Sequence, residues 1–351
     1  MLALLTRLWA GLARLGWDVP LPRPGFSSLH GPLMVSGFLG TLISLERAVA
    51  LGRPWAYATP LLTGLGGVSL IVGAPLLAAQ WLMLAGSLGL VAIFAAIIRR
   101  HPALYTFTMG GGSLVWALGN LLWCLGWPVF LVVFWWAAFL VVTIAGERLE
   151  LARLQQVTGA AQATFLLLLG ILLAGLLLLG WSFDGGVRLF GLGLAGLALW
   201  LGRHDIARRT VKQAGLTRFI AICLLTGYVW LGISGLSAMW FGGVPVGPQY
   251  DATLHAFFLG FVFAMIFAHA PIIFPAVLGA RMAYRPLFYA HVVLLQVTLV
   301  VRLIGDAAGW SAGRQVGGLL NAVTLLLFLV NTVSALRSPP ERTGRVQARA
   351  S

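Results

Sequence analysis

Charged residues are scarce in this chain. Only 9% of its 351 residues are Asp, Glu, Lys or Arg, whereas 60% are hydrophobic. A soluble domain carries about 25% charged residues, so most of the surface of this protein is expected to face lipid. The composition therefore excludes a soluble domain and predicts an all-α protein, a polytopic transmembrane helical bundle.

Cysteine is nearly absent, and acidic residues are few. Cys124 and Cys223 lie in separate apolar segments with no partner spacing, which leaves a disulfide framework and a thiolate metal site unsupported. The net charge of +14 comes from basic residues in short connections between apolar runs. Membrane topology explains such a distribution, so the lipid bilayer, and no nucleic acid, is the expected partner.

Long apolar runs dominate the rest of the chain, and a span needs about 20 such residues. Residues 1–20 begin as MLALLTRLWAGLARLGW, with Arg7 and Arg14 on one face, and predict a short amphipathic helix or a first span. The chain thus predicts a single transmembrane domain over residues 1–336 with 11–12 helices, followed by a basic cytoplasmic tail at 337–351. The eleven clear runs cover residues 31–50, 57–76, 78–98, 104–126, 128–146, 159–181, 186–202, 216–240, 251–278, 286–305 and 315–336.

The basic residues test this span count. Alternate connections and the C-terminal tail hold 17 of the 23 Lys and Arg residues. Cytoplasmic connections carry the excess of Lys and Arg. We therefore expect a multi-pass protein of the bacterial inner (plasma) membrane whose C-terminus is cytoplasmic.

Two histidines interrupt the apolar run DATLHAFFLGFVFAMIFAHAPIIFPAVLG, residues 251–279. His255 and His269 are fourteen positions apart, which in an α-helix places them on one face about 21 Å from each other. Ionisable residues inside a span are costly and therefore functional candidates. Asp251, one turn before His255, is placed to fix its imidazole tautomer.

His30 opens the first clear run, LHGPLMVSGFLG, from the same outer side as His255. Two imidazoles at one depth on different helices are able to hold the iron of a b-type haem from both axial positions. We therefore predict one haem b between His30 and His255.

A second, less favoured metal or haem site involves His269 and His291, about 20 Å deeper. Arg302 either pairs with Asp306, four residues later, or meets a haem propionate.

Two further features leave alternatives open. Pro271 and Pro275 predict a kink or break in their helix. The run MGGGSLVWALGN, residues 109–120, predicts either an unwound segment that lines a cavity or tight helix packing.

The runs around His30 and His255 resemble two groups of membrane haem proteins. One is the NnrS family, which is linked with bacterial nitric-oxide stress, and RPLFYAHVVLLQVTLVVRLIGD, residues 285–306, is similar to its C-terminal region. The other is subunit I of the haem–copper oxidases, whose H-G-x-x-M-like motif matches residues 30–34. The resemblance implies about twelve helices and a low-spin haem held by His30 and His255.

Two departures limit what the resemblance implies. The chain has no His-His pair and no histidine in residues 128–202, so an oxidase copper site is not expected. The H-x-H-E start of NnrS proteins is also absent, because Ser28 and Gly31 occupy two of its positions.

The sequence thus predicts a membrane haem protein in electron transfer or nitric-oxide-related redox chemistry, with a redox partner protein and a small gas such as nitric oxide as ligand. The alternatives are a cofactor-free transporter whose broken helices line a central site, and an accessory subunit of a respiratory complex.

Overall fold

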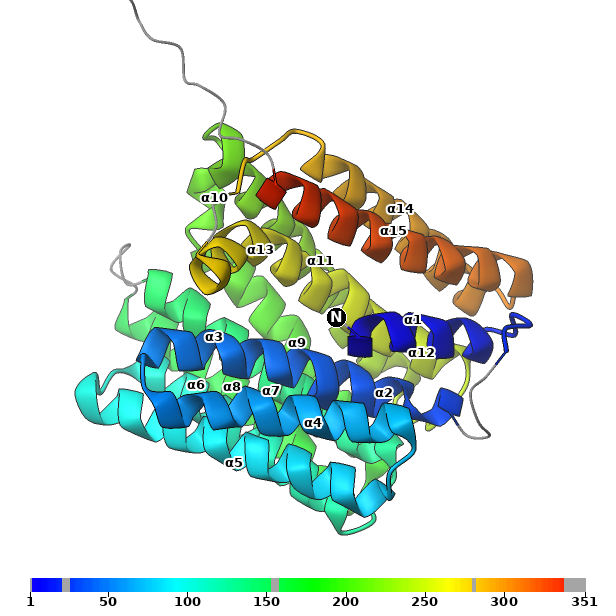
Figure 1. Ribbon diagram of the computed structural model, residues 1–351, viewed down its shortest axis with the longest axis horizontal. Helices are drawn as coiled ribbons and strands as arrows, with labels where there is room; N and C mark the ends of the chain where they lie inside the picture. Colours follow the sequence, from blue (N-terminus) through cyan, green and yellow to red (C-terminus); the bar gives the residue numbers. More distant parts are fainter. Residues whose placement is uncertain (1, 21–25, 153–157, 280–281, 338–351) are drawn as a thin grey trace, which may run out of the picture.

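The computed structural model describes residues 2–20, 26–152, 158–279 and 282–337. In this part of the chain all regular structure is helical, which confirms the predicted fold class. The helices lie side by side in one bundle (Figure 1). Residues 338–351 of the predicted tail lie outside the described residues.

The helices, in chain order, have the following bounds: α1 Leu2–Arg14, α2 His30–Pro32, α3 Thr41–Leu51, α4 Ala58–Val72, α5 Leu76–Arg100, α6 Leu104–Cys124, α7 Val129–Ala152, α8 Gly159–Leu178, α9 Phe183–His204, α10 Ala207–Thr210, α11 Gly215–Phe241, α12 Pro248–His255, α13 Phe263–Leu278, α14 Phe288–Ala307 and α15 Ser311–Arg337. Short 3₁₀ helices occupy Phe26–Leu29 (η1) and Pro54–Tyr57 (η3), and π-helices occupy Leu33–Gly40 (η2) and Ala256–Val262 (η5).

Ten helices in the described residues are long and apolar enough to cross a membrane. They coincide with ten of the eleven predicted runs. The eleventh run forms α6, a helix of 21 residues that is more polar because it carries Thr106, Thr108, Ser113 and Asn120. All eleven predicted runs therefore form helices.

Helix α7 forms the centre of the bundle. In its most apolar stretch 83% of the residues are buried, a larger share than in any other candidate span of the described chain. Helix α6 packs against α7, and Asn120 of α6 is fully buried there. The Asn120 side chain accepts hydrogen bonds from Trp136 of α7 and from Ser36 of η2, both at 3.0 Å. This network satisfies a polar group at the core, where an unpaired one is costly.

Two expected interruptions are absent from these helices. Helix α6 is continuous through the glycine run, and a Cβ at Gly112 would lie 2.7 Å from Thr143 Oγ1 of α7. The glycines therefore permit tight packing, which was one of the two predicted roles. Helix α13 contains both Pro271 and Pro275 and is continuous through them, so of the predicted kink or break the break does not occur.

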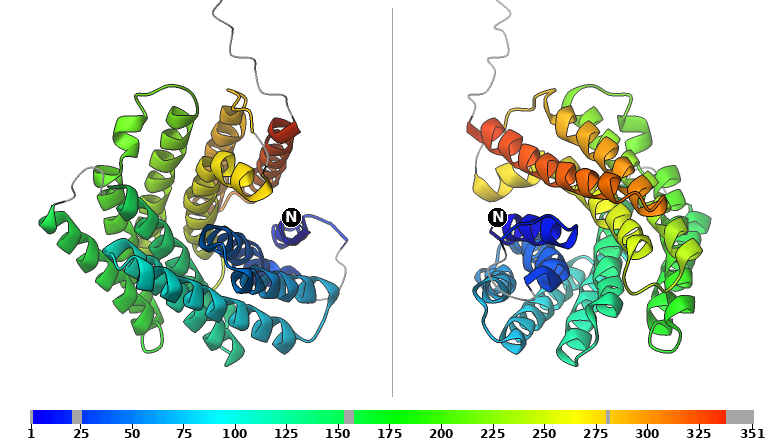
Figure 2. Two further views of the ribbon diagram at one scale, coloured as in Figure 1. Left: turned by 60° about the vertical axis from the view of Figure 1, so that its left-hand side comes forward. Right: turned by 90° about the vertical axis from the view of Figure 1, so that its right-hand side faces the viewer.

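Helix α1 is too short to be a twelfth span. Its 13 residues rise about 20 Å, whereas a hydrocarbon core measures about 30 Å. It packs against η2 and also contacts α15. In Figure 1 and in the right-hand view of Figure 2, α1 lies between α15 and the group of α2 to α4. This position makes α1 one wall of the site described next.

Candidate functional site

A cavity lies at the end of the bundle where α2 and α12 begin, which we call the cavity end. Its volume is about 1170 Å³ when its open mouth is included. The space is open at its mouth, and both polar and apolar side chains line it. Its polar lining comes from five helical segments and consists of Arg14, Ser28, His30, Tyr250, Asp251, His255, Arg302, Arg314 and Asn321.

The structure brings His30 and His255 together in this cavity. The two residues are 225 positions apart in the chain, but their ring centroids lie 6.3 Å apart with an angle of 34° between the ring planes. His30 begins α2 and His255 ends α12, and both helices enter the bundle from the cavity end. The two imidazoles therefore share one depth, as the sequence predicts.

The ring separation matches one particular way of sharing a metal ion. An imidazole nitrogen binds a metal at about 2.0–2.1 Å, and the ring centre lies about 1.1 Å beyond that nitrogen. Two rings on opposite sides of one ion then have centres about 6.3 Å apart, and at a tetrahedral angle about 5 Å. At this separation His30 and His255 would be able to hold one haem iron between them, and the iron would supply redox chemistry.

Asp251 orients the His255 ring. His255 Nδ1 lies 2.8 Å from the carbonyl oxygen of Asp251 and 3.2 Å from its Oδ1 atom. Because both partners are acceptors, the proton belongs on Nδ1, and Nε2 is the nitrogen able to bind a metal. Metal-binding histidines regularly use a carbonyl or carboxylate in this way. The donor set therefore fits a haem iron.

The arginines at the cavity end are partly neutralised. Arg302 donates two hydrogen bonds to Asp251 Oδ2, at 2.8 and 3.1 Å, while Nε of Arg314 lies 3.0 Å from Asp306. The expected ion pair of Arg302 with Asp306 is thus replaced by one with Asp251, because Asp251 lies beside Arg302 across the helix interface. Arg14 has no carboxylate partner among the described residues.

Helix α1 approaches His30 closely at Gly11. A Cβ at this position would lie 3.1 Å from His30 Cε1 and 3.3 Å from Nδ1. These distances are shorter than ordinary contacts, so any larger residue would push on the ring. Glycine at position 11 therefore allows α1 to close the cavity directly over His30.

A π-helical segment begins within three residues of each histidine. His30 and Pro32 precede η2, and His255 precedes η5. Such segments are rare and are frequent at functional sites. The sequence carries a matching signal, since Leu29-His30-Gly31 and Leu254-His255-Ala256 share the pattern Leu-His-small. The two helices thus share a short sequence pattern as well as a π-helical segment.

A family model described as "Domain of unknown function (DUF8744)" matches residues 1–337. The chain belongs to this family. No curated protein and no solved structure matches it. The match covers the cavity and all of the spans, so the site lies entirely within the DUF8744 region.

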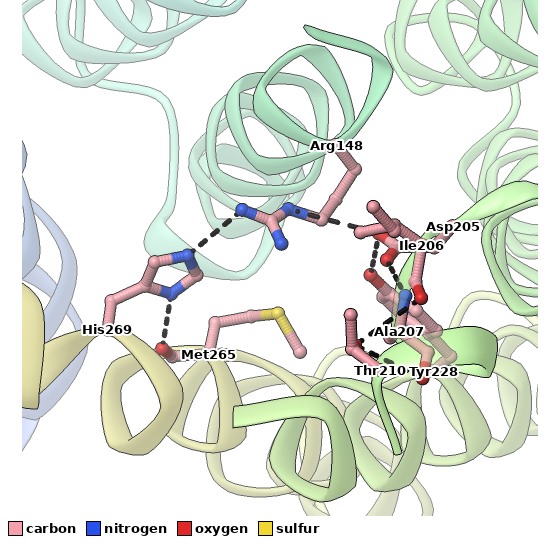
Figure 3. Close-up of polar contacts among 8 residues, drawn as sticks. All are labelled: Arg148, Asp205, Ile206, Ala207, Thr210, Tyr228, Met265 and His269. Atoms are coloured by element: carbon pink, nitrogen blue, oxygen red, sulfur yellow. Dashed lines mark hydrogen bonds and ion pairs between the residues drawn. The ribbon is translucent and has the colours of Figure 1, made fainter. Parts of the chain in front are cut away.

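In this DUF8744 chain the other intramembrane histidine of the same helix, His269, has a different environment (Figure 3). Its Nδ1 donates to the carbonyl oxygen of Met265 at 2.7 Å, and its Nε2 lies 3.1 Å from Arg148 Nη2. Both ring nitrogens are engaged, and Arg148 is a permanent donor. A metal ion at His269 would have to displace Arg148.

Arg148 connects His269 to a buried acid. Its Nε lies 4.0 Å from Oδ2 of Asp205, which accepts a hydrogen bond of 2.7 Å from the Tyr228 hydroxyl. The other carboxylate oxygen accepts from the backbone N–H of Ala207 at 2.7 Å. Figure 3 shows this chain of contacts running from α13 across α7 to α10 and α11. We call His269, Arg148, Asp205 and Tyr228 the arginine cluster.

His291 of the DUF8744 chain lies in an aromatic surrounding. Its ring centroid is 4.6 Å from that of Phe267 and 5.3 Å from that of Phe328. The Asn331 side chain lies 3.3 Å from Nδ1, while Nε2 is buried without a hydrogen-bond partner in the described structure. His269 and His291 thus have separate partners, and the deeper metal site stays a prediction. Within the described residues no group of three or more His, Cys, Asp or Glu side chains is arranged to hold a metal ion.

Proposed function

We propose that this protein is a membrane haem protein that holds one b-type haem between His30 and His255. The observation that supports the proposal is the 6.3 Å separation of the two rings in a cavity that several helices line. A haem iron bound there would supply one-electron redox chemistry. The residues of the chain would hold the iron, fix the imidazole tautomer and place positive charge beside the ring.

Electron transfer is the activity that this arrangement favours. His255 is held by Asp251, and His30 is confined by Gly11 of α1. If His30 and His255 both held the iron, an external ligand would find no open position on it. Nitric-oxide binding, which the likeness to NnrS proteins suggests, would require one of the two histidines to leave the iron.

We place the site near the outer face of a bacterial inner membrane, with the basic end of the bundle in the cytoplasm. The distribution of Lys and Arg supports this orientation. A redox partner protein would then meet the cavity end. Neither α6 nor α13 is broken, so the feature that favoured a transporter is missing from the described helices, and we propose no second function.

A reduced-minus-oxidised visible spectrum of the purified full-length protein tests the proposal. We expect a Soret band and sharp α and β bands, lost in His30→Ala and in His255→Ala. His101→Ala is the matched control, because His101 is exposed at the far end of α5. A colourless preparation that also fails to bind added haem b would refute the proposal.

Ligand exchange is tested on the same preparation. Addition of nitric oxide to the reduced protein leaves the spectrum unchanged if both histidines remain bound. A shifted spectrum would instead assign the protein to gas binding.

A further inference from the structure

Arg14 is a cavity-lining cation that no described acidic side chain neutralises. Three arginines line the cavity, and two of them face acids: Arg302 lies 2.8 Å from Asp251, and Arg314 lies 3.0 Å from Asp306. Arg14 has no such acid in the described structure. One positive charge therefore remains at the mouth of the cavity.

The end of α1 is fixed against α15, which holds Arg14 in place. The indole Nε1 of Trp17 lies 3.4 Å from the carbonyl oxygen of Gln315. Gly16 has a φ of 87°, in the left-handed region, and its α-carbon approaches the Gln315 side chain. Leu15 is buried and packs directly against Gly318. Arg14 is therefore next to an anchored turn, and its position at the mouth does not depend on a free helix end.

The surroundings of Arg14 suit the acid group of an amphipathic ligand. Tyr250, which belongs to the helix that carries His255, lines the same cavity. The deeper lining is apolar and includes Met34, Val133 and Phe258. A ligand with a flat apolar body and an acidic edge would thus bury the body between the histidines and leave the edge at Arg14.

We propose that Arg14 binds a carboxylate of the haem, so that helix α1 is part of the cofactor site. This inference rests on the proposed function, because it assigns a residue to the same cofactor. An arginine binds a carboxylate by charge-assisted hydrogen bonds, which are stronger than neutral ones. Snorkelling of Arg14 to the membrane surface is the plain alternative, and it predicts no effect on haem affinity.

The test compares two probes on the full-length protein in detergent: haem b and its dimethyl ester, which has the same ring but no free carboxylate. Arg14→Gln is expected to weaken haem b binding about tenfold, equivalent to about 1.4 kcal/mol, and to leave ester binding unchanged. Arg14→Lys keeps the charge and is expected to restore part of the loss. Arg100→Gln, an exposed charge at the other end of the bundle, is the matched control.

The outcomes separate this inference from the proposed function. Equal haem affinity in wild type and Arg14→Gln overturns the role of Arg14 and leaves the His30–His255 site standing. An equal loss for haem b and the ester also overturns it, because the loss then comes from a disturbed α1. A wild-type protein that binds neither probe overturns the proposed function itself.

Discussion

His255 and His269 lie on the same continuous helical stretch, and their local geometry is nearly the same. In each, Nδ1 donates to the carbonyl oxygen four residues earlier, at 2.8 and 2.7 Å. The difference is what the other nitrogen meets. Nε2 of His255 belongs to a ring that lies 6.3 Å from the His30 ring and lines the cavity, whereas Nε2 of His269 accepts from Arg148. The comparison shows that the chemistry of an intramembrane histidine depends on the group that another helix places next to its ring.

The two surroundings differ in packing as well. The cavity end has free volume and side chains that a ligand is able to reach, whereas the arginine cluster is buried, with Arg148 only 6% exposed. We therefore expect substitutions in the arginine cluster to change mainly stability, and substitutions at the cavity end to change mainly ligand binding. The predictions below examine this contrast.

The largest effect is expected for Arg148→Met. The change leaves Asp205 buried without its cation and removes the donor to His269, so it should lower the free energy of unfolding by about 3–5 kcal/mol. Thermal or denaturant unfolding of the detergent-solubilised protein measures this. Arg188→Met is the control, because Arg188 pairs with Asp184 at the surface, where such a pair contributes about 0–1 kcal/mol. Equal losses in the two variants would contradict the structural role of Arg148.

Alanine at the two compared histidines should separate binding from stability. His255→Ala is expected to weaken haem b binding more than about 100-fold, since loss of a supporting residue alone typically costs 10–100-fold. His269→Ala should leave haem affinity nearly unchanged but cost about 1–3 kcal/mol of stability, because Arg148 loses its acceptor. Haem titrations and unfolding curves of both variants give the answer. Loss of haem from His269→Ala alone would reverse the assignment of the two sites.

Asp251→Asn tests the support of His255. The amide keeps the size of the side chain but removes the charge that both His255 and Arg302 meet. We expect haem affinity to fall about 10-fold or more and the reduction potential to rise, because a nearby negative charge favours the oxidised iron. Asp184→Asn, which changes an exposed acid at the same end, should alter neither value. An unchanged potential in Asp251→Asn would show that Asp251 has no influence on the iron.

The smallest effect is expected for Gly11→Ala. One added methyl group meets the His30 ring, which has to shift by a few tenths of an ångström, so the cost is about 1 kcal/mol and the haem affinity falls several-fold. Gly111→Ala is the matched control, since a Cβ at position 111 meets no atom within 4 Å. Equal haem affinities in the two variants would show that α1 does not confine His30.

Much of the fold follows from the sequence, because each span corresponds to a continuous run of apolar residues. All eleven predicted runs are helices, and the approach of His30 to His255 was predicted from their shared depth. The partner of Arg302 was not predicted. Sequence spacing shows that Asp306 is a neighbour on the same helix, but it does not show that Asp251 of another helix lies beside Arg302. The position of α1 as a wall of the cavity was not predicted either. An amphipathic pattern shows that a helix has one apolar and one polar face, but not which elements cover each face.

The placement of His269 shows a second limit. A count of 3.6 residues per turn puts it directly below His255, but the π-helix η5 lies between them and changes that count. His269 consequently faces α7 and Arg148. Nothing in the apolar run 256–262 signals such a change, since Phe, Leu, Gly and Val suit either helical form.

The π-helices η2 and η5, next to His30 and His255, each separate two parts of a helix that face different demands. On one side of each π-helix the side chains pack in the bundle. On the other side the helix directs the ring of His30 or His255 toward the ring of the other histidine. Removing a single residue from 33–40 or from 256–262 would rotate the ring by about 100° while the packing beneath stayed as it is. The chain thus has two places where the direction of a ring can be adjusted independently of the scaffold, one next to each imidazole.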